Sequence, residues 1–382
     1  MRIKTASHAA IFGGLAMAMA HGAHADDAAP KAFSYDIAST SDAIADIGGG
    51  LKRGGRIMHN IDLTAGWDGQ NGWSAFGYVL EDFNGGFSSN YAGDAQTVSN
   101  IDADPGLRLF EAWVKKSSAD DKASVTFGLI NLNGIFDVQD VGGVFLNSSH
   151  GIGPDYSQAG PSIFPVSALG AVGQWRLDDH FAVRAGVFDG VPGDANDDRK
   201  FVYVRLGKDE GAHVVAEGEY DFDGGAVKLG HWQGTVAQTT LDGLGVKKPQ
   251  GTYGQVQFTF VKGKDDDHGL KGWVRAGQAE GQVLDLDRYT GGGVVLTGTF
   301  KGRDDDVAGL AVARAHWGAP YRALQAGPVA EETTWEASYQ AAIRPGISLQ
   351  PDIQYVTHPG GDYAVKNAVV VALRLKIDWL GL

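Results

Sequence analysis

Side chains along most of this chain alternate between apolar and polar, in stretches of about ten residues that end in Gly, Asp or Asn. In residues 253–261, Val256 and Phe258 share one face of the expected strand, and Gln255 and Gln257 share the other. A helix would instead repeat its apolar residues about every 3.6 positions. The alternation therefore predicts an all-β protein, because a period of two places successive side chains on opposite faces of a strand.

Strand length separates two all-β architectures that share this pattern. A soluble sandwich turns its apolar faces inward, whereas a transmembrane barrel turns them outward to lipid. Stretches of about ten residues suit a tilted strand that crosses a bilayer, while sandwich strands average about five or six. Tryptophans also recur near the ends of the stretches, as the interfacial girdles of a barrel require. These are Trp67, Trp73, Trp113, Trp232, Trp273, Trp317 and Trp379.

The stretches amount to sixteen candidate strands. An even number lets a bacterial barrel close with both chain ends on one side. Closure is needed because each unpaired backbone group in hydrocarbon costs several kcal/mol. We therefore predict a closed antiparallel transmembrane β-barrel with strands near 56–66, 73–83, 107–117, 123–132, 168–177, 180–188, 199–207, 212–222, 225–234, 251–262, 269–280, 292–302, 307–317, 333–343, 347–357 and 366–379.

The N-terminus has the form of an export signal. Arg2 and Lys4 precede a short apolar stretch at 9–20, and Ala23 and Ala25 form an A-x-A cleavage site. We expect residues 1–25 to be a signal peptide, 26–55 a lead-in segment and 56–382 the barrel. The expected location is the outer membrane of a Gram-negative cell, with membrane lipid as one partner.

Composition removes several other classes of protein. The chain has 382 residues, a formal net charge of −14 and no cysteine. The acidic balance argues against nucleic acid as a partner. Without cysteine there is no disulfide scaffold, thiolate metal site or thiol catalysis. The aspartate clusters lack the spacing of a calcium loop, and no catalytic motif is present. We therefore expect no metal site, no cofactor and no enzymatic activity.

The connection at residues 133–167 is long for a compact domain and rich in aromatic residues. Connections of this length are functional or disordered, and the aromatic content favours a folded loop. We expect this loop to fold into the barrel and to form the constriction of a pore.

Several sequence blocks resemble those of the carbohydrate-selective porin family, the OprB-like porins. The resemblance covers essentially the whole chain after residue 25, in the family's order. The blocks are Ile47–Gly54, Leu107–Trp113, Phe145–Gly151, Ser162–Pro165, Val187–Pro192 and Leu349–Val356. The resemblance implies a sixteen-stranded outer-membrane channel through which sugars diffuse passively into the periplasm, monosaccharides such as glucose among them. One departure is the C-terminal Leu382, where outer-membrane barrels usually end on an aromatic residue.

The resemblance makes Arg108 and Glu111 candidates for lining the constriction. Their spacing of three places them on opposite faces of a regular strand, so a bulge is needed for both to face the lumen. The alternative is a structural ion pair with a neighbouring strand.

Four further polar residues are candidates for contact with a sugar: Glu336, Gln350, Asp352 and Gln354. The last three share one face of an expected strand. They either line the lumen and bind sugar hydroxyls or form a wall network that holds the inward loop.

Alternative functions stay open at this level. The channel could have broad specificity or a weak preference for cations, because its charge is acidic. An enzyme on a barrel and a soluble or surface β-rich carbohydrate-binding protein are the alternatives of other classes. Sequence does not distinguish a monomer from a homo-oligomer such as a trimer.

Overall fold

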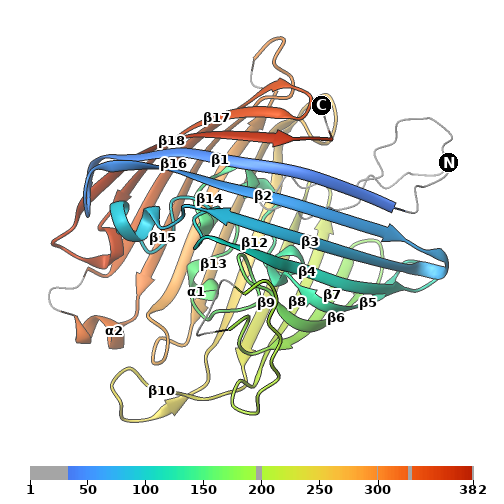
Figure 1. Ribbon diagram of the computed structural model, residues 1–382, viewed down its shortest axis with the longest axis horizontal. Coiled ribbons are helices and arrows are strands. Elements are labelled where there is room, and N and C mark those ends of the chain that lie inside the picture. Colours follow the sequence, from blue (N-terminus) through green and yellow to red (C-terminus); the bar gives the residue numbers. More distant parts are fainter. Residues whose placement is uncertain (1–32, 195–199, 299, 326–328, 381–382) are drawn as a thin grey trace.

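The computed structural model describes residues 33–194, 200–298, 300–325 and 329–380. Within these ranges, sixteen antiparallel strands form a closed barrel (Figure 1). Its strands are β1 (Phe33–Gly50), β2 (Gly54–Asp68), β3 (Trp73–Phe83), β4 (Gly106–Ser117), β5 (Ala123–Ile130), β6 (Ala168–Arg176), β7 (Phe181–Asp189), β8 (Ala212–Phe222), β9 (Gly225–Gly234), β12 (Gln250–Lys262), β13 (Gly269–Ala279), β14 (Leu286–Thr297), β15 (Val307–Trp317), β16 (Glu331–Arg344), β17 (Ile347–Thr357) and β18 (Lys366–Asp378).

Each strand pairs with its neighbours in the chain, and β1 pairs with β18 to close the ring. Most of the short connections and both termini of the described barrel lie at one rim, which we call the turn end; the short β1–β2 hairpin lies at the other. Most long connections leave from the other rim, which we call the loop end. They contain the hairpin β10 (Gln238–Thr239) and β11 (Val246–Lys247), and the helices α1 (Pro154–Ser157) and α2 (Ala319–Leu324). Short helical turns are η1 (Gln70–Gly72), η2 (Ser88–Ala92), η3 (Leu132–Gly134), η4 (Val141–Val144), η5 (Ser148–His150) and η6 (Pro359–Gly361).

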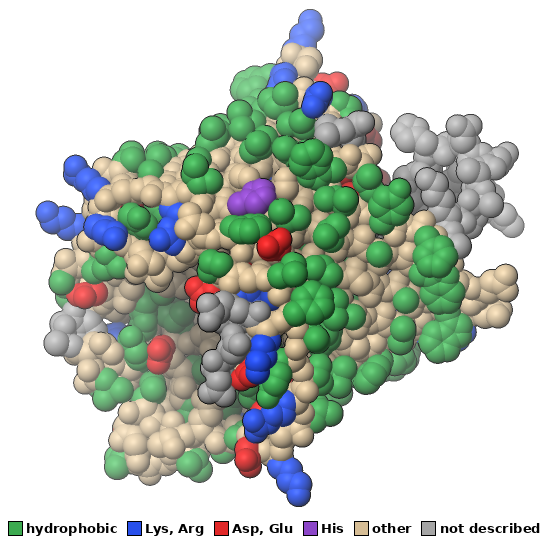
Figure 2. Space-filling model, viewed as in Figure 1, with side chains coloured by type: hydrophobic (Ala, Val, Ile, Leu, Met, Phe, Trp, Pro, Cys, Tyr) green, Lys and Arg blue, Asp and Glu red, His purple; other side chains and the backbone are tan. Residues whose placement is uncertain are grey.

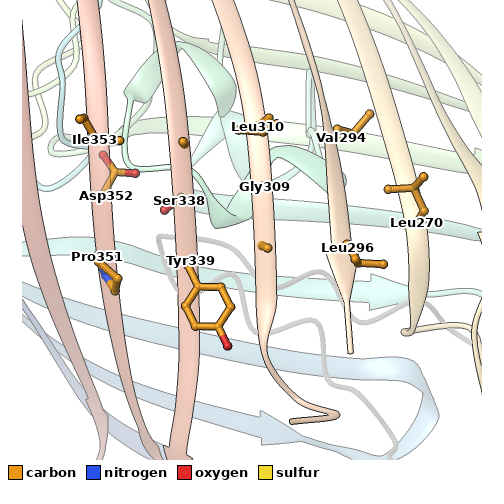
Figure 3. A pocket seen from close by; sticks show the side chains of 12 residues that line it. Leu270, Val294, Leu296, Gly309, Leu310, Ser338, Tyr339, Pro351, Asp352 and Ile353 are labelled. Carbon is orange, nitrogen blue, oxygen red and sulfur yellow. The ribbon is translucent and has the colours of Figure 1, made fainter. Parts of the chain in front are cut away.

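Apolar side chains cover the outside of this ring, and polar ones face its interior. In β18, Leu373 and Leu375 are 44% and 37% exposed, whereas Arg374 between them is 3% exposed. Apolar side chains cover much of the visible outer wall (Figure 2). On β13–β17, outward residues that include Val294, Leu310 and Ile353 line a shallow apolar groove (Figure 3). The prediction of an all-β closed barrel with sixteen strands is confirmed.

Two of the expected spans were wrong, and the two errors cancel in the strand count. The lead-in expected at 26–55 contains β1, which spans Phe33–Gly50. The middle of the outward row of β1 consists of small residues such as Ser39, Ala43 and Ala45, so the alternation is weak there. The strand expected at 199–207 is absent from the described residues 200–207, because β8 pairs directly with β7.

The expected aromatic girdles are only partly present. Trp67, Trp73 and Trp379 are exposed, as girdle residues should be. Four of the seven tryptophans are instead buried or half-buried, namely Trp113, Trp232, Trp273 and Trp317. Whether a tryptophan is exposed or buried depends on its place in the alternation of the strand, because a residue near a strand end can lie on either face. The expected signal peptide at 1–25 and the C-terminal Leu382 lie outside the described residues.

The outward face of β13 provides a test of the face assignment. Val274 lies at the middle of the strand and is 51% exposed. We predict that Val274→Lys makes folding into lipid vesicles less favourable by about 2–4 kcal/mol, because a cation would meet hydrocarbon at the bilayer midplane. Denaturant titration in vesicles measures this change. Val274→Leu is the control, and equal stability of the two variants would contradict the outward assignment.

Candidate functional site

Two long connections fold into the barrel and fill part of its interior. We call residues 84–105 inner loop A and residues 131–167 inner loop B. They bond to each other, since Asn100 N donates to Leu146 O at 2.7 Å and Ser148 N donates to Thr97 O at 3.0 Å. Helix α1 of inner loop B lies inside the ring of strands (Figure 1). The two loops therefore form one folded body inside the barrel.

A fully buried arginine holds inner loop B against the wall. Arg275 of β13 donates to both carboxylate oxygens of Asp137 at 2.7–2.9 Å, and its Nη1 donates to Asp155 Oδ1 at 2.7 Å. The guanidinium also lies 5.4 Å and 5.2 Å from the ring centroids of Tyr253 and Tyr289. One cation thus holds two carboxylates that lie 18 positions apart in the same loop.

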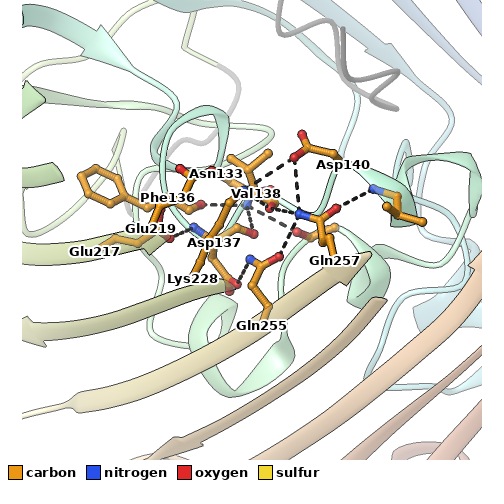
Figure 4. A network of polar contacts seen from close by, with 12 residues as sticks. Asn133, Phe136, Asp137, Val138, Asp140, Glu217, Glu219, Lys228, Gln255 and Gln257 are labelled. Carbon is orange, nitrogen blue, oxygen red and sulfur yellow. Dashed lines mark hydrogen bonds and ion pairs between the residues drawn. The ribbon is translucent and has the colours of Figure 1, made fainter. Parts of the chain in front are cut away.

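Polar side chains of β8, β9 and β12 surround the same stretch of inner loop B (Figure 4). Asp137 N donates to Glu217 Oε2 at 2.8 Å, and Lys228 Nζ donates to Val138 O at 2.8 Å. Gln257 Oε1 accepts a hydrogen bond from Val141 N at 2.8 Å. Burial raises the pKa of Asp137 to about 6, while Arg275 acts in the opposite direction, so Asp137 is ionised at neutral pH.

The next part of inner loop B is held by β16 and β17, through residues that the sequence singled out. Glu336 accepts hydrogen bonds from Leu146 N at 2.5 Å and Asn147 N at 3.2 Å. Gln350 Nε2 donates to Val144 O at 2.5 Å, and Gln354 Oε1 accepts from Asn147 Nδ2 at 3.2 Å. Each of these side chains is at most 3% exposed. These contacts match the wall network that the sequence left open as an alternative.

Asp352 belongs to the same face but has a weaker connection to the loop. It is 6% exposed, and its Oδ1 accepts a hydrogen bond from Gln354 Nε2 at 3.2 Å. The adjacent loop residue His150 is fully buried, with its Nε2 3.3 Å from Glu336 Oε2. Its ring also packs against Phe145 and Trp273, with centroid distances of 5.0 Å and 5.7 Å.

Inner loop A has its own anchors on β1, β16 and β18. Arg374 donates from Nε and Nη2 to the carboxylate of Asp42 at 2.7 Å each, and Ser99 Oγ donates to the same carboxylate at 2.7 Å. Glu332 accepts hydrogen bonds from the backbone N–H groups of Ala95 and Gln96 at 2.9–3.2 Å. The β1–β18 seam and inner loop A therefore share one buried ion pair.

The structure brings Arg108 and Glu111 to the same side of β4. The β3–β4 register shifts between Tyr78 and Val79, and the bulge lies opposite at Phe110. Arg108 Nη1 lies 3.0 Å from Asp82 Oδ2, and Glu111 accepts from Asn131 N at 3.1 Å. Arg108 thus contacts the neighbouring strand, and Glu111 fixes the first residue of inner loop B.

A row of very small residues on the inner face of β15 lets inner loop B approach the wall closely. Ala311, Ala313 and Ala315 are buried, and a Cβ added at Gly309 would lie 2.5 Å from Phe145 Cζ. Such a contact is shorter than van der Waals packing allows. Glycine at 309 therefore sets the position of Phe145 and of η4 beside it.

Some polar groups inside the barrel are partly open to the lumen. Asp140 of inner loop B has a side chain 43% exposed, and those of Arg184 and Glu219 are 17% and 13% exposed. Arg184 is paired with Glu217 and Glu219, so this cluster has one acidic group more than it has cations. In contrast, the stacked rings of Tyr156 and Trp232, 4.8 Å apart, are fully buried.

Sequence reasoning missed the residues that hold inner loop B most firmly. Arg275 and Glu217 fall on the polar faces of their strands, so their inward direction was readable from alternation. Their partners Asp137 and Asp155 lie in an irregular loop, where no periodicity indicates direction. Among the described residues, no group of three or more His, Asp or Glu could hold a metal ion, and no helix has the length and hydrophobicity to span a membrane.

A closed barrel that is apolar outside, polar inside and partly filled by folded loops defines a diffusion channel of the porin class. The family model of the carbohydrate-selective porins, OprB family, matches residues 60–379. The chain therefore belongs to the carbohydrate-selective porin family. Fold and family imply an outer-membrane location, and both are those of channel proteins.

Solved structures share this fold at low sequence identity. The high-pH structure of Pseudomonas putida OprB has a TM-score of 0.81 and 19% identity, over 91% of this chain and 94% of that one. The outer-membrane channel DcaP of Acinetobacter baumannii has a TM-score of 0.59 and 11% identity, over 91% of this chain and 97% of that one. No protein with a curated description matches this chain.

The Arg275 contacts predict how firmly inner loop B is held. Arg275→Gln leaves Asp137 and Asp155 buried without their cation, which costs about 3–5 kcal/mol for a buried pair. We predict a loss of hydrogen-exchange protection and new protease cleavage within residues 131–167. Arg176→Gln is the matched control, because Arg176 is 47% exposed in its pair with Asp221 and such pairs contribute at most about 1 kcal/mol. Unchanged protection in Arg275→Gln would contradict the anchoring role.

The buried His150 predicts a pH dependence of the same loop. Burial lowers the pKa of His150 to about 3, below the unfolded value of 6.5, although the nearby Asp352 carboxylate opposes this shift. Unfolded chains bind the proton first, so the stability from neutral His150 is complete above pH 6.5. It falls by about 1.4 kcal/mol per pH unit as acidification proceeds toward pH 3. We predict that exchange protection of residues 141–152, corrected for intrinsic rates, drops between pH 7 and 5. His150→Phe should weaken this dependence, and an equal drop in the variant would assign it to other groups.

Proposed function

We propose that this porin lets neutral sugars, monosaccharides such as glucose among them, diffuse passively into the periplasm. The observation that carries the proposal is the folded body of inner loops A and B, which narrows the polar interior of the closed barrel. Membership of the carbohydrate-selective porin family supports the same substrate class.

The hydrogen-bonding capacity of the interior supports a sugar as substrate. Arg184 is paired with two glutamates, and Arg275 with two aspartates. A passage beside such groups offers donors and acceptors for hydroxyl groups. Affinity must stay weak, because a sugar bound tightly would not leave.

We assign different roles to the two kinds of polar residue. Arg108, Glu111, Glu336, Gln350, Asp352 and Gln354 are buried in wall and loop contacts. In this proposal they set the width of the passage by fixing the loops. The partly exposed side chains of Asp140, Arg184 and Glu219 are the groups that a sugar would meet.

A channel of broad specificity with a cation preference is the second candidate, and the net charge of −14 favours it. The soluble alternative does not fit the exposed apolar rows of the strands, because they would meet water.

Conductance in planar bilayers tests the proposal. We predict that the purified protein forms stable channels and that glucose lowers their conductance more than an uncharged polymer too large to enter. Liposome swelling with a panel of sugars then ranks the substrates. Asp140→Ala should change the concentration of glucose needed for half block, whereas Asp223→Ala, at the 93%-exposed turn between β8 and β9, should not. Channels that conduct but respond to no sugar, with potassium favoured over chloride, would support the second candidate instead.

A further inference from the structure

The outer wall has a groove at the seam where β18, β1 and β2 meet, near the loop end. Its floor is made of the small residues Ala43, Ala45 and Gly55. In the β-sheet register, Ala43 lies between Ile57 and Leu373, and Ala45 lies between Gly55 and Val371. Larger apolar side chains therefore flank a shallow channel that follows β1, with Ile57, Val371 and Leu373 at its sides.

Cationic side chains gather at the loop end of this groove. Lys52 and Arg53 form the tip of the β1–β2 hairpin, and Lys366 lies opposite Gly50 in the β1–β18 register. All three cations are exposed. Lys and Arg side chains gather at the hairpin end of the molecule (Figure 2).

Acidic groups near the hairpin compensate for these charges only in part. Asp46 is 2% exposed and lies on the inward-facing row of β1, and Asp362 is exposed in the connection that precedes β18. Lys52 Nζ lies 4.7 Å from the centroid of the Tyr91 ring, a contact that leaves its charge in place. The hairpin end is thus cationic on a chain whose net charge is −14.

The groove and the cations are spaced like the two parts of a lipid. At about 3.3 Å per residue, Ala45 lies roughly 16 Å along β1 from Gly50, beside which the cations lie. The loop end faces the cell exterior in barrels of this kind, so the cations lie at the headgroup level of the outer leaflet. A chain of methylene groups fits the groove, and a phosphate fits the cations.

We propose that this seam is a binding site for a phosphorylated lipid of the outer leaflet, with an acyl chain along Ala43 and Ala45 and a phosphate against Lys52, Arg53 and Lys366. This proposal depends on the outer-membrane location of the protein but not on the identity of the substrate that passes through the channel. A second apolar groove, the one across β13–β17 in Figure 3, differs in the charged residues near it. It lies near the turn end, where cations are paired with acids, as in Lys264–Asp304 at 3.6 Å.

Native mass spectrometry of the full chain in detergent tests the site. The probe is lipid A carrying two phosphate groups, compared with the same lipid after removal of its phosphates. We expect the phosphorylated form to bind more tightly and to weaken as salt is raised. The double variant K52Q/R53Q should lower its affinity about tenfold to thirtyfold, because each cation near a membrane surface contributes about a fivefold factor.

Two matched variants control for charge and for groove shape. Lys208→Gln with Lys248→Gln removes two loop-end lysines elsewhere and should leave binding unchanged. Ala45→Phe fills the proposed groove and should abolish binding of phosphorylated lipid A. Ala308→Phe fills the groove of Figure 3 and should leave that binding unchanged. A heat-modifiable band shift on gel electrophoresis shows that each variant is folded.

Several results would overturn the proposal. Equal binding of both lipids by the wild type would remove the role of the cations, and equal binding by all folded variants would remove the site. If Ala45→Phe altered the oligomeric state and left lipid binding unchanged, the seam would be an interface between two copies of this chain. The reduction of channel conductance by glucose is independent of these outcomes. A failed lipid site would therefore leave the sugar proposal intact.

Discussion

Closure of the barrel at the β1–β18 seam is the constraint on which the rest of this structure depends. In hydrocarbon a strand edge without a partner leaves backbone groups unsatisfied, so a membrane-spanning sheet must close on itself. Closure then separates an outside that meets lipid from an inside that does not. The inside can hold charge, and here it holds Arg275, Arg374 and the acids that pair with them. The same seam joins Asp42 to Arg374 and, through Ser99, reaches inner loop A.

The buried ion pairs position the inner loops more than they stabilise the barrel. Taking charges out of water costs several kcal/mol per ion, and their attraction offsets this only with good geometry. Arg275 has that geometry, with hydrogen bonds to two carboxylates and the rings of Tyr253 and Tyr289 close to its guanidinium. The benefit of such a pair is specificity, because an unpaired charge makes alternative loop positions unfavourable. A passage whose width must be constant needs this kind of fixed loop.

The sequence predicted the class of fold through one property, the period-two alternation of strands such as β12 and β18. It failed where that property is weak or misleading. The middle of the outward row of β1 is made of small side chains, so its alternation has little contrast. The alternation at 200–207 has no neighbouring strand to pair with. Alternation also gave the inward direction of Gln350 and Gln354. Their partners in the chain are 206 and 207 positions away, however, and no local pattern indicates which loop backbone they contact. The role of Arg108 was likewise left open between lining the constriction and an ion pair with a neighbouring strand, because the bulge at Phe110 depends on that strand.

The smooth inner face of β15 has a consequence for how such channels diversify. Because Gly309 and the alanines after it take up almost no room, the depth at which η4 sits depends on side-chain bulk as well as on its hydrogen bonds to Gln257 and Gln350. A methyl group added at Gly309 would clash with the Phe145 ring and push η4 away from β15. Descendants of this protein would then have a way to alter the calibre of the conduit through side-chain size, without any change of charged residues.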